Sequence, residues 1–122
     1  MGNPVNWFEI YVQDMARAKR FYEQVLGVTF TRLGSPEIEM WGFPSDQGGD
    51  GASGSLVRAP GVPSGGNSTL VYFRCADCAV EAARVEAAGG RVHRPKMSIG
   101  PYGHVVLAVD TDGNMFGLHS MQ

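Results

Sequence analysis

The sequence predicts an α+β domain made of two tandem βαβββ modules. Two segments share one layout of six strand-like residues, one spacer and an Asp, which is Asp14 in the first copy and Asp77 in the second. An Asp in this place caps a helix, because its carboxylate accepts from the free N–H groups of the first turn. Thirteen residues after each Asp stands a glycine, Gly27 or Gly90. Gly27 can adopt the left-handed conformation that ends the first helix, and the second helix is expected to stop at Gly89-Gly90. Matching layouts at a fixed spacing indicate a repeat, so we expect each sheet to curve around a shared cleft with the helices on the outer face.

The length of 122 residues suits one domain and is too short for two independent cores. We therefore expect a single domain over 1–122, with modules at about 5–59 and 67–120 and a linker at 60–66. The formal net charge of −2 gives no electrostatic reason to expect a nucleic acid or an anionic membrane as partner. No apolar run approaches the ~20 residues of a transmembrane helix, and the start of the chain lacks the pattern of a secretion signal. Two cysteines do not make a disulfide framework, so we expect a cytoplasmic protein.

Hydrophobic periodicity places the elements of each module. The apolar stripe of the first helix consists of Met15, Ala18, Tyr22, Val25 and Leu26. The second helix is alanine-rich over 79–88. Three strands are expected after each helix, near 28–33, 37–43 and 54–58 in the first module and near 91–94, 104–109 and 114–119 in the second. The Asp-Gly pair at 112–113 predicts a hairpin turn, and loops are expected at 45–53 and 95–103.

Several short motifs follow one another in a recognisable order. They are a strand with Asp14, then Ala18, Phe21-Tyr22 and Leu26-Gly27, and later Gly89-Gly90 and the run 110–114. This order resembles the vicinal oxygen chelate superfamily, which includes glyoxalase I, extradiol dioxygenases and bleomycin-resistance proteins, although Thr111 stands where a proline is usual. The Trp-Phe-Glu-Ile run at 7–10 is similar to the opening of its uncharacterised branch related to lactoylglutathione lyase. The resemblance implies the fold, whereas the superfamily hosts many chemistries.

The resemblance also implies four metal-ligand positions, which hold His, Glu or Gln in metal-dependent members. Carried onto this chain, these positions fall on Trp7, near Ser55, on Leu70 and on Gly117. Trp, Leu and Gly have no lone pair to offer, and Ser is a poor ligand for divalent metals. We therefore expect no metal and no other cofactor.

Two further motifs suggest metal or redox chemistry. Cys75 and Cys78 form a C-x-x-C at a strand-to-helix junction, as in thioredoxin-like sites. Cys75 shares the face of buried residues, however, so we expect two unpaired structural thiols. The pair Asp110 and Asp112 is similar to the start of a calcium loop, but Met121 stands where such a loop needs a bidentate Glu.

Alternation along each strand assigns side chains to the cleft, because successive side chains point to opposite faces. In the strand 104–109 the bulkier set, Val105, Leu107 and Val109, is assigned to the core, which leaves His104 on the cleft side. The strand 37–43 likewise places Trp41 inward. The candidate catalytic residues are Glu9 and His104. The candidate ligand-binding residues are Trp7, Tyr11, Trp41, Tyr72, Arg74 and His119.

Three interpretations of function remain open at this point. The first is a metal-free protein that holds an aromatic or cationic small molecule between Trp and Tyr faces, with Glu9 opposing positive charge. The second is a metal-independent isomerase or lyase with Glu9 as general base beside Arg74 or His104. The third is a non-catalytic scaffold in which Glu9 and Arg74 form a structural ion pair. A homodimer is expected in each case, because modules of this superfamily commonly complete their sheets across a two-fold axis.

Overall fold

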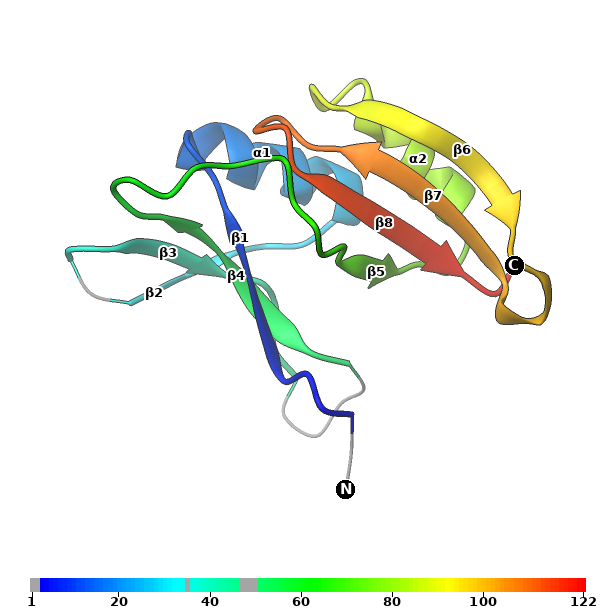
Figure 1. Ribbon diagram of the computed structural model, residues 1–122, viewed down its shortest axis with the longest axis horizontal. Coiled ribbons are helices and arrows are strands. Elements are labelled where there is room, and N and C mark those ends of the chain that lie inside the picture. The colour runs from blue at the N-terminus through cyan, green and yellow to red at the C-terminus, as the bar shows by residue number, and fades with distance from the viewer. Residues whose placement is uncertain (1–2, 35, 47–50) are drawn as a thin grey trace.

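The computed structural model describes residues 3–34, 36–46 and 51–122, and within them the chain forms two four-stranded sheets and two α-helices (Figure 1). The N-terminal sheet has the strand order β1 (Trp7–Tyr11), β4 (Ser53–Arg58), β3 (Glu39–Gly42) and β2 (Thr31–Leu33). The C-terminal sheet has the order β5 (Tyr72–Arg74), β8 (Met115–Ser120), β7 (His104–Val109) and β6 (Arg91–Ser98). The neighbours β1 and β4 are parallel, as are β5 and β8, and all other neighbouring strands are antiparallel. The α+β class and the tandem βαβββ modules are confirmed. Residues 47–50 of the loop expected at 45–53 lie outside the described residues.

Each helix begins at the Asp that the sequence predicts. The Asp14 carboxylate accepts from the backbone N–H of Arg17 at 3.1 Å, and α1 (Met15–Leu26) ends at Gly27, whose φ is 70°. The Asp77 carboxylate accepts from the N–H of Ala79 at 3.0 Å, and α2 (Cys78–Val85) ends earlier than the alanine-rich run suggests. No helix among the described residues is long and apolar enough to cross a membrane.

The strand β6 continues to Ser98, although a loop was expected from residue 95. Its pairing with β7 shifts register twice, between Val92 and Arg94 and between Arg94 and Met97. Pro95 lies within the second of these shifts, on the outermost strand of the sheet. A proline is tolerated there because an edge strand with bulges can spare the N–H that proline lacks. The expected loop shrinks to the 3₁₀ turn η1 (Gly100–Tyr102).

The helix α1 packs against both sheets. The Tyr22 ring is 5.8 Å from that of Phe43 at the end of β3, 5.9 Å from that of Phe73 in β5 and 5.5 Å from that of Phe116 in β8. The helix-bearing faces of the two sheets therefore share one apolar core, into which α1 buries its apolar face. We call the opposite face of each sheet its open face.

The two modules are also joined by a buried hydrogen bond. The Tyr22 hydroxyl donates to Asp110 at 2.6 Å, and both residues are almost entirely buried. The same carboxylate accepts from the N–H groups of Asp112 and Asn114, which closes the predicted hairpin, and Gly113 takes a φ of 83° there. The hairpin turn is confirmed, and Asp110 both closes it and holds α1 against it.

Candidate functional site

Three candidate residues lie together on the open face of the N-terminal sheet. The Glu9 carboxylate accepts a hydrogen bond from the Tyr11 hydroxyl at 2.8 Å and from the Trp7 indole N–H at 3.4 Å. The hydrogen bond to Glu9 is the main cause that raises the pKa of Tyr11 above its ordinary value. Trp7 is 42% exposed. We call these residues the β1 cluster: a negative charge fixed between two aromatic rings and open to solvent.

A cavity of about 370 Å³ borders the β1 cluster. Glu9 and Tyr11 line it on one side, and Val71 and Phe116 of the second module line it on the other. The linker closes it, held in place by the Ser64 hydroxyl, which donates to the Tyr11 carbonyl at 2.6 Å. Its walls combine apolar residues with the polar Asn67, Thr69 and Asn114, a mixture that is typical of a small-molecule site.

The other three candidates on an open face lie on the C-terminal sheet. Tyr72 is 49% exposed, and its ring covers Gly117, where any side chain would collide with it. His119 lies two pairs further along β8, opposite Arg74, and its Nε2 is 2.7 Å from the Tyr102 carbonyl oxygen. Tyr72, Arg74 and His119 line a cavity of about 380 Å³.

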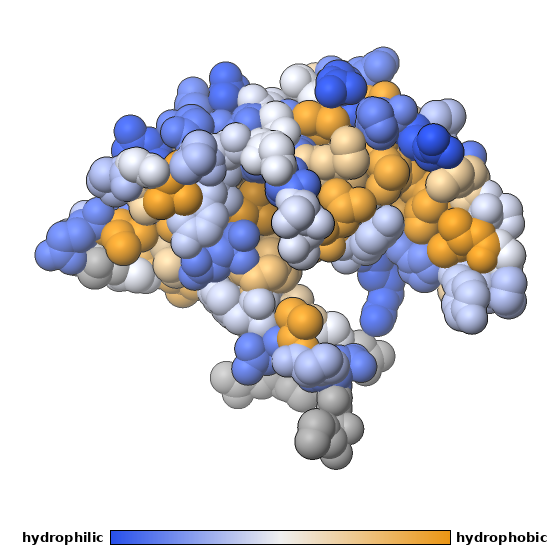
Figure 2. All heavy atoms as spheres, in the orientation of Figure 1, coloured by the Kyte–Doolittle hydropathy of each residue, from blue (hydrophilic) through white to orange (hydrophobic). Residues whose placement is uncertain are grey.

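A second cavity of about 430 Å³ continues along the same face. It is lined by Tyr72, Met97, Ile99, Val105, Leu107 and His119. Figure 2 shows apolar residues gathered over the C-terminal sheet on this side of the molecule. Sequence reasoning missed Met97 and Ile99 because they fell in an expected loop, and it assigned Val105 and Leu107 to the core.

The prediction that His104 points into the cleft is wrong. His104 pairs with Ser120, whose hydroxyl accepts from the N–H of Cys78 at the start of α2, so His104 lies on the helix-bearing face. The core residues of β7 are Val106 and Ala108, both fully buried. A small Ala108 lets α2 approach the sheet closely, so side-chain size indicated the wrong face.

The prediction that Trp41 points into the cleft is also wrong. Its ring lies 3.3 Å from the Lys19 ammonium of α1, and its indole N–H donates to Glu39 at 3.2 Å. Trp41 faces the helices because Phe43, two residues further along, points the same way and packs in the aromatic core. Met40, paired with Val57, points to the open face instead. Trp41 holds α1 to β3 through a cation–π contact.

Glu9 and Arg74 lie on different sheets and form no ion pair with each other. The ion pairs among the described residues join Arg17 to Asp112 and Lys96 to Asp77. Within one chain, Glu9 and Arg74 therefore do not form the ion pair that the scaffold interpretation predicts.

The donor set at the four implied ligand positions does not fit a metal ion. Trp7 and Leu70 offer no lone pair, Ser55 is fully buried, and Gly117 is covered by Tyr72. Among the described residues, no three His, Cys, Asp or Glu side chains come close enough to share an ion.

Both cysteines are buried and free. Burial, followed by the nearby Glu81 carboxylate, raises the pKa of the Cys75 thiol to about 12. The thiolate is the reactive form of cysteine, so this pair is structural, as the strand parity predicts.

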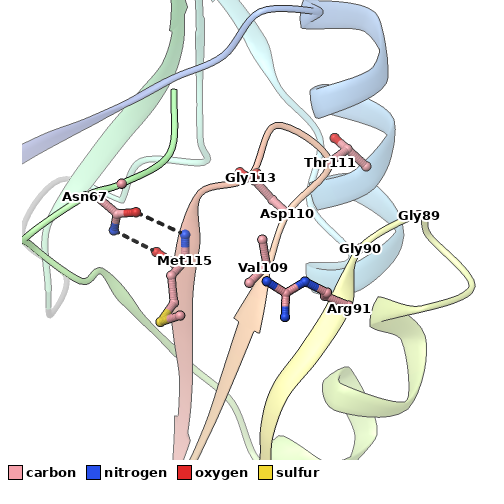
Figure 3. A pocket seen from close by; sticks show the side chains of 10 residues that line it. Asn67, Gly89, Gly90, Arg91, Val109, Asp110, Thr111, Gly113 and Met115 are labelled. Atoms are coloured by element: carbon pink, nitrogen blue, oxygen red, sulfur yellow. Dashed lines mark hydrogen bonds between the residues drawn. The ribbon is translucent and has the colours of Figure 1, made fainter. Parts of the chain in front are cut away.

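A further cavity of about 470 Å³ lies at the hairpin end of the C-terminal sheet (Figure 3). Gly89, Gly90 and Arg91 border it. Asn67, which directly follows the linker, closes it by donating to the Met115 carbonyl at 3.1 Å and accepting from the Met115 N–H at 3.2 Å. The glycine-rich turns that border it were visible in the sequence, but their convergence was not. Asn67 and Asp110 are already hydrogen-bonded, whereas the buried Thr111 hydroxyl, which also borders the cavity, has no hydrogen-bond partner.

The sequence matches the family model of the Glyoxalase/Bleomycin resistance protein/Dioxygenase superfamily over residues 5–118. The chain belongs to this superfamily. The resemblance of the motifs is thereby confirmed. A search of the curated proteins finds no match.

Solved structures of the superfamily have the same fold. A glyoxalase I mutant from Zea mays has a TM-score of 0.76 at 22% identity, covering 97% of this chain and 46% of its own, so this chain spans under half of that enzyme. A glyoxalase/bleomycin resistance/dioxygenase domain from Frankia sp. EAN1pec has a TM-score of 0.74 at 17% identity, over the full length of both chains. TnmS3, an antibiotic-binding protein from Streptomyces sp. CB03234, has a TM-score of 0.68 at 27% identity, covering 97% of this chain and 95% of its own. Family and neighbours support a small-molecule-binding protein.

Proposed function

We propose that this protein binds a planar aromatic cation, without a metal, on the open faces of its sheets. The observation that carries the proposal is the β1 cluster, in which the Glu9 carboxylate is held between an indole and a phenol on an exposed surface. Aromatic faces attract cations and stack on flat ligands, and a fixed carboxylate adds charge complementarity. The likeness to an antibiotic-binding protein supports the same class of function.

We propose further that two copies of the chain complete the site as a homodimer. Within one chain, Glu9 and Tyr11 line one cavity, whereas Tyr72, Arg74 and His119 line another. Tyr72 and Ile99 leave large apolar surfaces exposed on the open face of the C-terminal sheet. A two-fold axis would place the β1 cluster of one copy opposite Tyr72 of the other and cover this surface. The two buried free thiols fit a reducing compartment, so we place this function in the cytoplasm.

The alternative of acid–base catalysis has less support. Its second group, His104, lies on the helix-bearing face, and Arg74 does not pair with Glu9. Glu9 alone, with its carboxylate already accepting two hydrogen bonds, is better arranged to hold a cation than to take a proton from a substrate.

Calorimetric titration with N-methylquinolinium and with neutral quinoline tests the proposal. These probes share a bicyclic shape and differ in charge. We expect the cation to bind about tenfold more tightly, which corresponds to roughly 1.4 kcal/mol, and Tyr72→Ala to weaken both probes. Equal affinities for the two probes, or no binding of either, would contradict the proposal.

A further inference from the structure

The open face of the C-terminal sheet is apolar in its middle and bordered by positive charge along β6. The cavity of about 430 Å³ on this face has mostly apolar walls, and none of its lining residues is acidic. None of the strands β5, β6, β7 and β8 contains an Asp or a Glu. Figure 2 shows hydrophilic residues along β6 beside the apolar surface. We call this cavity the β6 trough.

Arg94 stands at the border of the β6 trough. It is exposed on β6 and pairs with Leu107, which lines the trough. Its Nη1 donates to the Sδ of Met97, another lining residue, at 3.8 Å. The guanidinium is therefore held beside the apolar wall. Sulfur is a weak acceptor, so this contact leaves the other donors of the guanidinium available to a ligand.

A β-bulge places Arg94 on this face of the sheet. In an unshifted ladder that continues from the pair of Val92 and Ala108, Arg94 would stand opposite Val106, which is fully buried on the helix-bearing face. The register shift after Val92 sets Arg94 opposite Leu107 instead. Bulges commonly re-aim a side chain beside a functional site. The irregularity in β6 therefore supplies a charge to the open face.

The charge of Arg94 is not neutralised by a carboxylate of the described residues. Lys96, two residues further along β6, is paired with Asp77 at 2.8 Å, whereas Arg94 takes part in neither of the ion pairs that the described residues form. A guanidinium can bind a carboxylate through two parallel N–H donors. Arg94 is thus the group that a ligand carboxylate would contact.

Tyr72, Gly117, Leu107 and Arg94 form one row across the sheet. The ring of Tyr72 covers Gly117 at one end of the row, and Arg94 stands at the other end. Leu107 lies between them as an apolar floor. Neighbouring strands are about 4.8 Å apart, so two strand spacings, roughly 10 Å, separate the backbone under the Tyr72 ring from that of Arg94. A molecule with a ring at one end and a charge at the other matches this row.

From this geometry we infer that the β6 trough binds an amphiphilic monocarboxylate, whose aromatic ring packs against Tyr72 and Leu107 and whose carboxylate pairs with Arg94. The inference uses contacts within one chain only and does not depend on the cation proposed for the β1 cluster. Tyr72 lines both the trough and the cavity beside Arg74, whereas Met97 and Leu107 line only the trough of the two.

The test compares 4-phenylbutyrate with 4-phenylbutyramide, which has nearly the same size and shape but no charge. Binding is followed at neutral pH by amide chemical-shift changes in two-dimensional NMR of the full chain. We expect the carboxylate to bind about fivefold more tightly than the amide, because it gains a charge-assisted contact with a guanidinium. The largest shifts should fall at residues 94, 97, 105 and 107.

Three variants make the result specific to Arg94. Arg94→Gln removes the charge and should reduce the affinity ratio of the two probes to about one. Arg94→Lys keeps the charge without the paired donors, so the carboxylate should still bind more tightly, by a smaller factor. Arg20→Gln is the matched control, because Arg20 is exposed on α1 and does not line the trough. It removes the same charge and should leave the ratio unchanged.

The inference is overturned if wild-type protein binds the amide as tightly as the carboxylate, or if neither probe binds at millimolar concentration. An unchanged ratio in Arg94→Gln, or shifts confined to β1, would overturn it as well. The preference for N-methylquinolinium over quinoline depends on Glu9, which lies on the other sheet. Either proposal can therefore fail while the other stands.

Discussion

The substitution Glu9→Gln separates binding from structural support. The amide keeps the size of the side chain and one acceptor oxygen, so the contacts with Trp7 and Tyr11 weaken without a steric change. Glu9 is exposed and forms no ion pair with Arg74. Exposed substitutions of this kind usually change stability by within about 0.5 kcal/mol, which corresponds to a shift of about 2 °C in Tm.

The expected effect on binding is larger. A cation about 4 Å from a carboxylate gains roughly 1 kcal/mol in bulk water and about 4 kcal/mol near a protein surface. Because Glu9 is exposed, a value near the lower end applies, and Glu9→Gln should weaken N-methylquinolinium by about tenfold. Neutral quinoline should change little. Calorimetry on both probes measures the difference.

Tyr11 provides an internal readout of the same substitution. Its pKa is raised mainly by the hydrogen bond to the Glu9 carboxylate. Removing that charge should lower the Tyr11 pKa toward its ordinary value, and ultraviolet titration of the phenols, with Tyr11→Phe for assignment, detects the change. The reasoning is refuted if Glu9→Gln lowers stability by about 3–5 kcal/mol, the cost of breaking a buried ion pair, or if both probes lose affinity equally.

Further predictions concern the core, the thiols, the metal and the assembly. Tyr22→Phe removes a buried hydrogen bond to Asp110 and should lower stability by about 2 kcal/mol and Tm by about 8 °C; an unchanged calorimetric Tm would contradict this. Burial raises the pKa of Asp110 in the folded protein despite its hydrogen bonds. Its protonation therefore stabilises the fold fully below the pKa that Asp110 has in the unfolded chain, and this stabilisation is lost as pH rises through its folded pKa. Tyr22→Phe removes a hydrogen bond that lowers the pKa of Asp110. In this variant, urea unfolding at a series of acidic pH values should show that the stability due to Asp110 is lost at a higher pH than in the wild type. Cys75 and Cys78 should react with a thiol reagent only on unfolding, and rapid labelling of native protein would argue against structural thiols. Elemental analysis should find less than about a tenth of an equivalent of Zn, Ni, Mn or Fe, since the implied ligand positions offer no fitting donors. Light scattering should give the mass of a dimer at micromolar concentration, and a monomer mass would count against the shared site.

The sequence was most informative where one residue type meets a local backbone requirement. Asp14 and Asp77 are the helix caps and Gly27 ends α1 as predicted, because capping depends on neighbouring atoms only. The parity of β1 was also predictable, since Phe8 and Ile10 form an uninterrupted apolar alternation. These elements bring Trp7, Glu9 and Tyr11 together as expected.

The inward face of β3 and β7 was not predictable from side-chain size. The core selects Phe43 because Tyr22 and Phe73 lie around it, and it selects Ala108 where α2 comes close. Both choices depend on the packing of one element against another, which no local pattern encodes. The two candidate residues placed on the wrong face, Trp41 and His104, follow from these two strands.

The two tryptophans allow the most direct test of the open-face proposal, because they lie on opposite faces of the N-terminal sheet. Trp41→Phe leaves Trp7 as the only tryptophan, and Trp7→Phe leaves Trp41 against Lys19. Titration of both variants with N-methylquinolinium, followed by tryptophan fluorescence, reports which ring the ligand contacts. We predict saturable quenching in Trp41→Phe and only weak, linear quenching in Trp7→Phe. Saturable quenching of Trp41 with none of Trp7 would contradict the proposal that the ligand binds on the open face.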